Sequence, residues 1–262
     1  MNTREDKLHA FGRLLDIMDQ LRAECPWDKK QTMDSLRHLT IEETYELCDA
    51  ILDEDMEEVK TELGDLLLHL VFYAKIGSEK KAFDIADVLN GICEKLIYRH
   101  PHIYGDLEVQ DEEEVKRNWE QLKLKEKGPK SSVLEGVPTS LPALVKAVRM
   151  QDKVRGVGFD FPNTKEVWAK VKEELAEFEA EVAANDSTKM EAEFGDLLFS
   201  LVNYARHMEI NPEDALERTN KKFRKRFQEM EKQIHADAKN ITDMNLPEMD
   251  VYWDRVKKQL QG

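Results

Sequence analysis

The sequence contains little glycine, proline or cysteine. Among its 262 residues are 11 glycines and 8 prolines, whereas charged residues make up 35% and hydrophobic residues 41%. A chain with so few turn-forming residues is better suited to amphipathic helices than to a turn-rich β fold. The 3 cysteines, Cys25, Cys48 and Cys93, are widely spaced and support neither a disulfide framework nor a Cys-x-x-Cys metal site. We therefore expect an all-α protein with reduced thiols.

Long apolar runs and an excess of basic residues are also missing. The first residues, Met1 to Lys7, are mostly polar, and no apolar stretch is long enough for a signal peptide or a membrane span. The formal net charge of −15 argues against a broad surface for nucleic acid, although a small anion can still bind in a local cationic pocket. We expect a cytoplasmic protein that binds neither a membrane nor nucleic acid.

One sequence pattern occurs twice in the chain. Three pairs of segments are each separated by 131 positions: Glu42–Leu47 and Glu173–Phe178, Glu62–Leu67 and Glu193–Leu198, and Tyr73–Ala74 and Tyr204–Ala205. Farther along, the separation changes by a few residues, and Lys95, Arg99 and Trp119 are matched by Lys222, Arg226 and Trp253. Such a steady register indicates a duplicated unit.

The two copies are joined by a segment with the composition of a linker. Residues 125–142 contain three prolines together with Gly-Pro and Ser-Ser pairs. We predict an N-terminal helical unit at 1–124, a linker at 125–140 and a C-terminal helical unit at 141–262. From the spacing of apolar residues, helices are expected at about 5–24, 33–52, 56–76, 84–99, 111–126, 141–154, 164–184, 188–208, 212–235 and 247–260.

Paired carboxylates occur at helical spacing in both copies. Residues three apart lie on one face of a helix, and if the chain turns at residues 53–55, an antiparallel helix pair places position 46 opposite 62 and position 43 opposite 65. A turn near residues 185–187 repeats this geometry in the second copy. The four acids expected to converge are Glu43, Glu46, Glu62 and Asp65 in the first copy and Glu174, Glu177, Glu193 and Asp196 in the second.

These carboxylates are predicted to bind metal. They lie on strips that otherwise resemble core, beside Leu66 and Leu67 or Leu197 and Leu198. Partly desolvated like charges either take up protons or bind cations, and an all-oxygen set favours a hard ion such as Mg²⁺, with Mn²⁺ as a substitute. The alternative is that they form solvated helix faces of an acidic protein.

The motif Glu-Glu-x-x-Glu, followed sixteen residues later by Glu-x-x-Asp, resembles the signature of MazG nucleotide pyrophosphohydrolases. The resemblance extends to Cys25–Asp28 and Arg99–His102 and covers nearly the whole chain. It implies helical bundles completed as a homodimer, and Mg²⁺-dependent hydrolysis of nucleoside triphosphates of varied base to monophosphate and pyrophosphate. It further implies that the acids of the second copy hold Mg²⁺ while water attacks the α-phosphorus, with Glu173 as a candidate base.

Cations for the triphosphate are expected on the helices of the second copy, because the chain lacks a Gly-x-x-x-x-Gly-Lys-Ser/Thr loop. Lys222 and Arg226, four residues apart, resemble the phosphate-contacting helix of the family. Lys170, Lys172 and Lys189 add positive charge, whereas the first copy has Leu39, Ile41 and Glu58 at these positions. We therefore predict that the C-terminal unit carries most turnover, while the N-terminal unit retains its metal site. Trp253 either stacks on a base or, like Trp119, packs structurally.

Three alternatives remain open at this level. One is a narrower enzyme, resembling a dUTPase or a phosphoribosyl-ATP pyrophosphohydrolase. Another is a non-catalytic helical module that binds metal or a regulatory protein partner. Finally, His69 lies four residues after Asp65 and could reach a metal, but we interpret it as a polar core residue, and His100 and His102 as structural.

Overall fold

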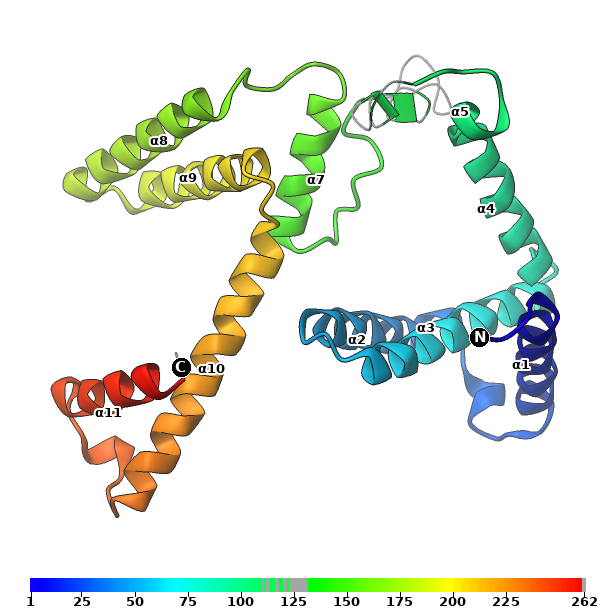
Figure 1. Ribbon diagram of the computed structural model, residues 1–262, viewed down its shortest axis with the longest axis horizontal. Helices are drawn as coiled ribbons and strands as arrows, with labels where there is room; N and C mark the ends of the chain where they lie inside the picture. The colour runs from blue at the N-terminus through cyan, green and yellow to red at the C-terminus, as the bar shows by residue number, and fades with distance from the viewer. Residues whose placement is uncertain (110, 112–113, 116–117, 120–121, 123–131, 261–262) are drawn as a thin grey trace. The chain divides into compact units, whose positions relative to one another are not determined.

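The computed structural model describes residues 1–109, 111, 114, 115, 118, 119, 122 and 132–260. Within these ranges every regular element is a helix, which confirms the all-α prediction (Figure 1). The chain forms two compact units, Met1–Glu112 and Glu113–Gly262. Most of the helix predicted at 111–126, and the predicted boundary at 124, lie outside the described residues. No helix in the described ranges is long and apolar enough to cross a membrane.

The first unit is built around a helical hairpin. Its helices α2 and α3 lie side by side (Figure 1). The turn between them falls where the sequence predicts it, because Glu54 adopts a left-handed backbone with φ of 57° and the Asp55 side chain accepts hydrogen bonds from the first turn of α3. The helices of this unit are α1 (Arg4–Glu24), η1 (Asp28–Lys30), α2 (Met33–Leu52), α3 (Met56–Glu79), α4 (Ile85–Arg99) and α5 (Pro101–Tyr104).

The core of the first unit lies where α1 and α2 pack on the C-terminal half of α3. Its buried members are Met18, Leu36, Val71, Phe72 and Ile76. The last three lie on one side of α3, where Phe72 and Ile76 are one turn apart and Val71 adjoins Phe72, as in an amphipathic helix. An ion pair between Arg22 of α1 and Glu79 at the end of α3 closes the edge of this core.

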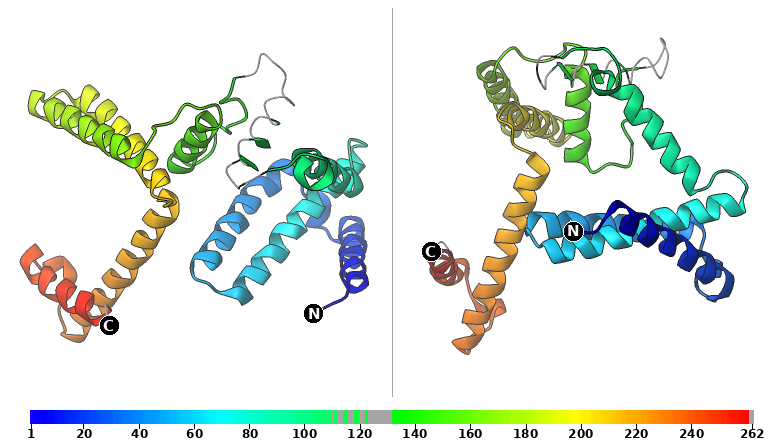
Figure 2. Two further views of the ribbon diagram at one scale, coloured as in Figure 1. Left: turned by 45° about the horizontal axis from the view of Figure 1, so that its top comes forward. Right: turned by 45° about the vertical axis from the view of Figure 1, so that its right-hand side comes forward.

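The second unit repeats the hairpin and extends it. Its helices α8 and α9 pair as α2 and α3 do (Figure 2). Asn185 in the turn has a left-handed φ of 55°. The helix α10 leads away from α9, and α11 folds back on its far part through Met230, Ile234, Tyr252 and Val256. The helices of this unit are α7 (Ala143–Arg155), α8 (Thr164–Ala184), α9 (Ser187–His207), α10 (Pro212–Ala236), η2 (Ile241–Asp243) and α11 (Leu246–Gln259).

The described part of the predicted linker is bound to α7. The Lys153 amine, buried with its side chain, donates to the backbone oxygen of Val133 at 3.2 Å. Lys146 donates to the backbone oxygen of Thr139 at 2.6 Å. Since a buried ammonium group needs an acceptor, these contacts hold residues 132–140 against α7.

Candidate functional site

Each hairpin brings three carboxylates together. In the second unit one oxygen each from Glu174, Glu177 and Glu193 lies within 4.8 Å of the others. We call these residues together with Asp196 the C-terminal acid set. In the first unit the corresponding group is Glu43, Glu62 and Asp65, which together with Glu46 form the N-terminal acid set. The sequence predicts four converging acids in each hairpin, and the structure groups three in each.

The acid sets are electrostatically strained. Burial raises the pKa of Glu62, and the nearby charges of Glu46, Glu58, Glu43 and Asp65 raise it further. The Glu62 side chain is only 5% exposed, and its Oε2 has no hydrogen-bond partner among the described residues. A buried carboxylate oxygen without a donor is costly. A hard cation would satisfy this oxygen and offset the repulsion, so the donor set fits Mg²⁺ or Mn²⁺.

The same effects act in the second unit. Burial raises the pKa of Glu177, and the charges of Glu174 and Glu193 add to this effect. Here, however, Lys170 supplies a positive charge: its amine lies 2.6 Å from Glu174 and 2.8 Å from Glu173. Hydrogen bonds to Glu173 and Glu174 raise the pKa of Lys170, so it remains protonated. Glu173, the candidate base, is thereby held beside the acid set.

A cavity of about 550 Å³ adjoins the C-terminal acid set within the second unit. Lys170, Glu174 and Asp196 line it where it adjoins the acid set. Further polar side chains in the lining are Gln151, Asp160, Ser200, Asn203 and Arg206. The rest is largely apolar and is lined from α7, α9 and the segment 158–162, including Met150, Val154, Phe159, Phe161 and Phe199. A concave, mostly apolar site with a small number of polar groups is typical of a small-molecule site.

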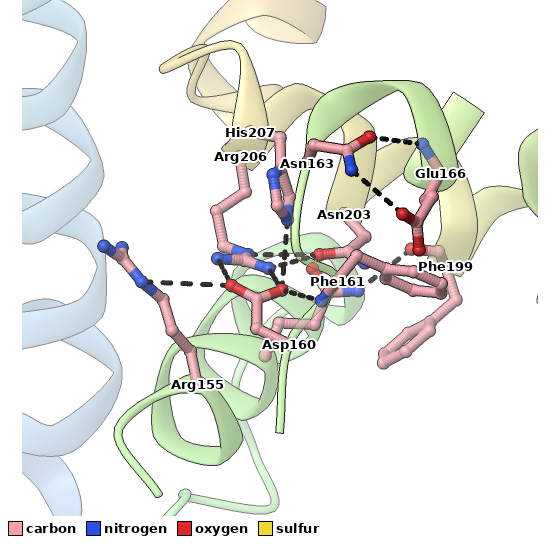
Figure 3. Close-up of polar contacts among 10 residues, drawn as sticks. Arg155, Asp160, Phe161, Asn163, Glu166, Phe199, Asn203, Arg206 and His207 are labelled. Carbon is pink, nitrogen blue, oxygen red and sulfur yellow. Dashed lines mark hydrogen bonds and ion pairs between the residues drawn. The ribbon is translucent and has the colours of Figure 1, made fainter. Parts of the chain in front are cut away.

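One wall of this cavity is anchored through Asp160 (Figure 3). Its carboxylate accepts hydrogen bonds from the Arg206 guanidinium and lies 3.0 Å from Nε2 of His207, both near the end of α9. It also accepts from the backbone N–H of Phe161 at 2.9 Å. Burial alone would raise the pKa of Asp160, but the hydrogen bonds from Arg206 and His207 outweigh burial and hold this pKa below its usual value.

Asp160→Asn is expected to lower the free energy of unfolding at neutral pH by about 2 kcal/mol, because Arg206 loses a charged partner. Since the folded-state pKa of Asp160 is lowered, its contribution is complete above the unfolded value of about 3.9 and is lost as the pH falls through the folded value. The measurement is the free energy of unfolding in urea, for the unmodified protein and for Asp160→Asn, between about pH 2 and 7. The difference in stability should shrink in acid, and a constant difference would contradict the assigned ion pair.

The remaining predicted phosphate contacts lie elsewhere in the second unit. Lys189 is mostly exposed, 3.8 Å from both Glu181 and Asp186. Lys222 and Arg226 are on α10, and Trp253 of α11 packs its ring 5.3 Å from Phe223. In the described part of the chain, no hydrogen bond, ion pair or ring contact joins these residues to the C-terminal acid set.

The sequence motifs do not predict the cavity or its lining residues Gln151, Phe199 and Asn203. A comparison of the two copies does indicate open space here, because the smaller Ser200 and Asn203 occupy the positions of His69 and Phe72 in the first unit. His69 is buried, in agreement with its interpretation as a polar core residue, and lies outside the carboxylate group of the first unit. The three cysteines are free thiols.

The sequence matches the model of the MazG nucleotide pyrophosphohydrolase domain twice, at residues 31–104 and 163–230. This chain belongs to the MazG family. Each match contains one of the helical hairpins and its acid set. The predictions of the family and of a nucleotide pyrophosphohydrolase enzyme are therefore confirmed.

Relatives of this MazG-family chain match along nearly its whole length. It is 42% identical over 259 residues to the nucleoside triphosphate pyrophosphohydrolase of Escherichia coli strain K12, covering 96% of this chain and 98% of that protein. It is 42% identical over 250 residues to a nucleoside triphosphate pyrophosphohydrolase/pyrophosphatase MazG of Thermotoga maritima, covering 94% and 95%. A solved MazG-related protein from Thermotoga maritima aligns with 43% of this chain and 98% of its own, at 24% identity and a TM-score of 0.39.

Proposed function

We propose that this protein hydrolyses nucleoside triphosphates of varied base to monophosphate and pyrophosphate in a Mg²⁺-dependent reaction. The observation that carries the proposal is the group of three carboxylates within 4.8 Å of one another, beside Lys170 and a cavity large enough for a nucleoside. The names of the full-length relatives support this substrate class. We assign the main reaction to the C-terminal unit.

Glu174, Glu177, Glu193 and Asp196 would hold the Mg²⁺. When bound, the ion supplies neutralisation of phosphate oxygens and lowers the pKa of water. Lys170 would exchange its contact with Glu173 for one with the triphosphate, leaving Glu173 free to accept a proton from water. The water oxygen bonds to the α-phosphorus as the bond to the bridging oxygen breaks, and pyrophosphate departs with that electron pair.

The N-terminal unit is proposed to bind metal with little turnover. Its acid set has the same spacing, but Leu39 occupies the position of Lys170 and packs against the core of the first unit. Glu58, where the second unit has Lys189, adds negative charge beside Glu62. A tetra-anionic triphosphate is therefore attracted less strongly to this unit.

Product analysis tests the reaction. The protein is incubated with Mg²⁺ and a panel of ribo- and deoxyribonucleoside triphosphates, and the products are separated. We expect monophosphate and pyrophosphate from several bases. Release of diphosphate and phosphate would reject attack at the α-phosphorus, and restriction to one substrate would favour the narrower dUTPase-like or phosphoribosyl-ATP pyrophosphohydrolase-like alternative. No release would favour a metal-binding interaction module.

We further infer a homodimer. The α8–α9 hairpin exposes large apolar side chains, which a second copy would cover. These side chains are Leu175, Val182, Phe194, Leu198 and Leu201. A second copy also offers Lys222 and Arg226 as a source of cations for the acid set. Light scattering at micromolar concentration should give about twice the chain mass of 30.5 kDa, and a monomeric mass would reject the dimer.

A further inference from the structure

We propose that the cavity beside the C-terminal acid set binds the base of the nucleotide, and that Gln151 makes the polar contact with it. This inference rests on the proposed function, because a triphosphate at the acid set determines which part of the substrate reaches the cavity. The ligand class is a planar heteroaromatic base that carries an N–H donor.

The cavity has the walls that a flat base requires. Phe159, Phe161 and Phe199 line it, and all three keep more than a third of their surface accessible. Aromatic faces stack on planar rings and tolerate different bases, since every base has such a face. The volume of about 550 Å³ lies within the range of small-molecule sites.

Gln151 lines this cavity and has an unused acceptor. Its side chain lies on α7, is 4% exposed and donates from Nε2 to the backbone oxygen of Phe199 at 2.9 Å. That bond orients the amide, and Oε1 remains buried without a hydrogen-bond partner among the described residues. A buried acceptor of this kind is stabilised when a ligand N–H reaches it. Every common nucleobase presents at least one N–H group other than its glycosidic nitrogen.

The order of residues along α9 matches the order of groups in a nucleotide. Asp196, Phe199 and Asn203 all line the cavity and follow one another at one-turn spacing. At 1.5 Å per residue, Asn203 lies about 10 Å along the helix from Asp196. A ribose can span this interval, with the phosphates at the acid end and the base between Phe199 and Asn203.

The duplicated unit supplies an internal comparison. In the same register, the first unit has His69 and Phe72 at the positions of Ser200 and Asn203. Phe72 is 2% exposed and belongs to the hydrophobic core of that unit. Large side chains therefore occupy this region in the first unit, whereas the smaller Ser200 and Asn203 border open space in the second. The open site lies beside the acid set that also has Lys170.

The test compares two ligands that differ by the nucleoside. Calorimetry in the presence of Mg²⁺ measures the Kd of α,β-methylene-ATP, whose bridge resists hydrolysis, and the Kd of inorganic tripolyphosphate. Asn203→Phe introduces the residue of the first unit and should weaken binding of the nucleotide about tenfold or more, leaving tripolyphosphate unchanged. Gln151→Met keeps the side-chain volume but removes the acceptor, and should weaken binding of the nucleotide about threefold or more.

Leu216→Phe is the matched control, because it adds a ring at an exposed leucine of α10 outside the cavity and should change neither Kd. Unchanged nucleotide binding in both cavity variants would place the base elsewhere, and equal weakening of both ligands would show a general distortion; either result overturns the proposal. Absence of nucleotide binding by the unmodified protein also overturns it. Selective weakening in a protein that releases no pyrophosphate would support the base site while rejecting the proposed hydrolysis.

Discussion

Glu193→Gln should reduce nucleoside triphosphate turnover by about 100-fold or more, whereas Glu62→Gln should leave most of it intact. Both substitutions remove one carboxylate charge at aligned positions of the two hairpins. Their expected effects differ because only the C-terminal acid set has Lys170 within 2.6 Å and adjoins the described cavity. The measurement is the initial rate of pyrophosphate release at saturating Mg²⁺.

The two variants serve as controls for each other. A change from glutamate to glutamine preserves side-chain volume, and thermal unfolding verifies that both proteins remain folded. If Glu62→Gln abolished turnover and Glu193→Gln did not, the assignment of the reaction to the C-terminal unit would be wrong. Equal partial losses would indicate that both units turn over substrate, which also contradicts the assignment.

Removal of divalent metal should abolish turnover, and addition of Mg²⁺ or Mn²⁺ should restore it. Without a cation, the three close carboxylates of the C-terminal acid set repel a highly charged triphosphate, and Lys170 offsets only part of their negative charge. The experiment is pyrophosphate release after chelation and dialysis, followed by stepwise addition of metal. Activity that persists at the original rate in excess chelator would exclude the proposed dependence on metal.

Metal should also stabilise the protein without any substrate. Burial raises the pKa of Glu46, Glu62 and Glu177, and neighbouring carboxylates raise it further, a repulsion that a cation relieves. Millimolar Mg²⁺ is therefore expected to raise the Tm of the unmodified chain by several degrees, since binding to the native state alone stabilises it. A smaller rise in the variant carrying both Glu62→Gln and Glu193→Gln would assign the effect to the acid sets.

Much of the fold follows from short-range patterns. The helix predicted at 164–184 is α8, and the helix predicted at 188–208 is found one residue earlier as α9. Their first residues are set by the N-terminal capping residues Asn163 and Asp186, whose side chains accept hydrogen bonds from the first turn of each helix. The helix predicted at 56–76 continues to Glu79, because the apolar spacing of α3 extends to Ile76 and nothing interrupts the last turn.

The sequence by itself determined the all-α class, the duplication and the spacing of the acids. These properties depend on helical periodicity and on the register between copies, which are local or purely sequential. Residues three apart share a helix face in any fold. The hairpin turns at 53–55 and near 185–187 therefore sufficed to predict which helices would bring their acids together.

Only the tertiary structure decided which acids meet and what surrounds them. Asp65 joins the group of three in the first unit, whereas its counterpart Asp196 lines the cavity of the second. The orphaned oxygen of Glu62 and the orientation of Gln151 likewise depend on side chains from other helices. Rotamers, burial and cavities are set by packing between helices, which the order of residues along one helix does not specify.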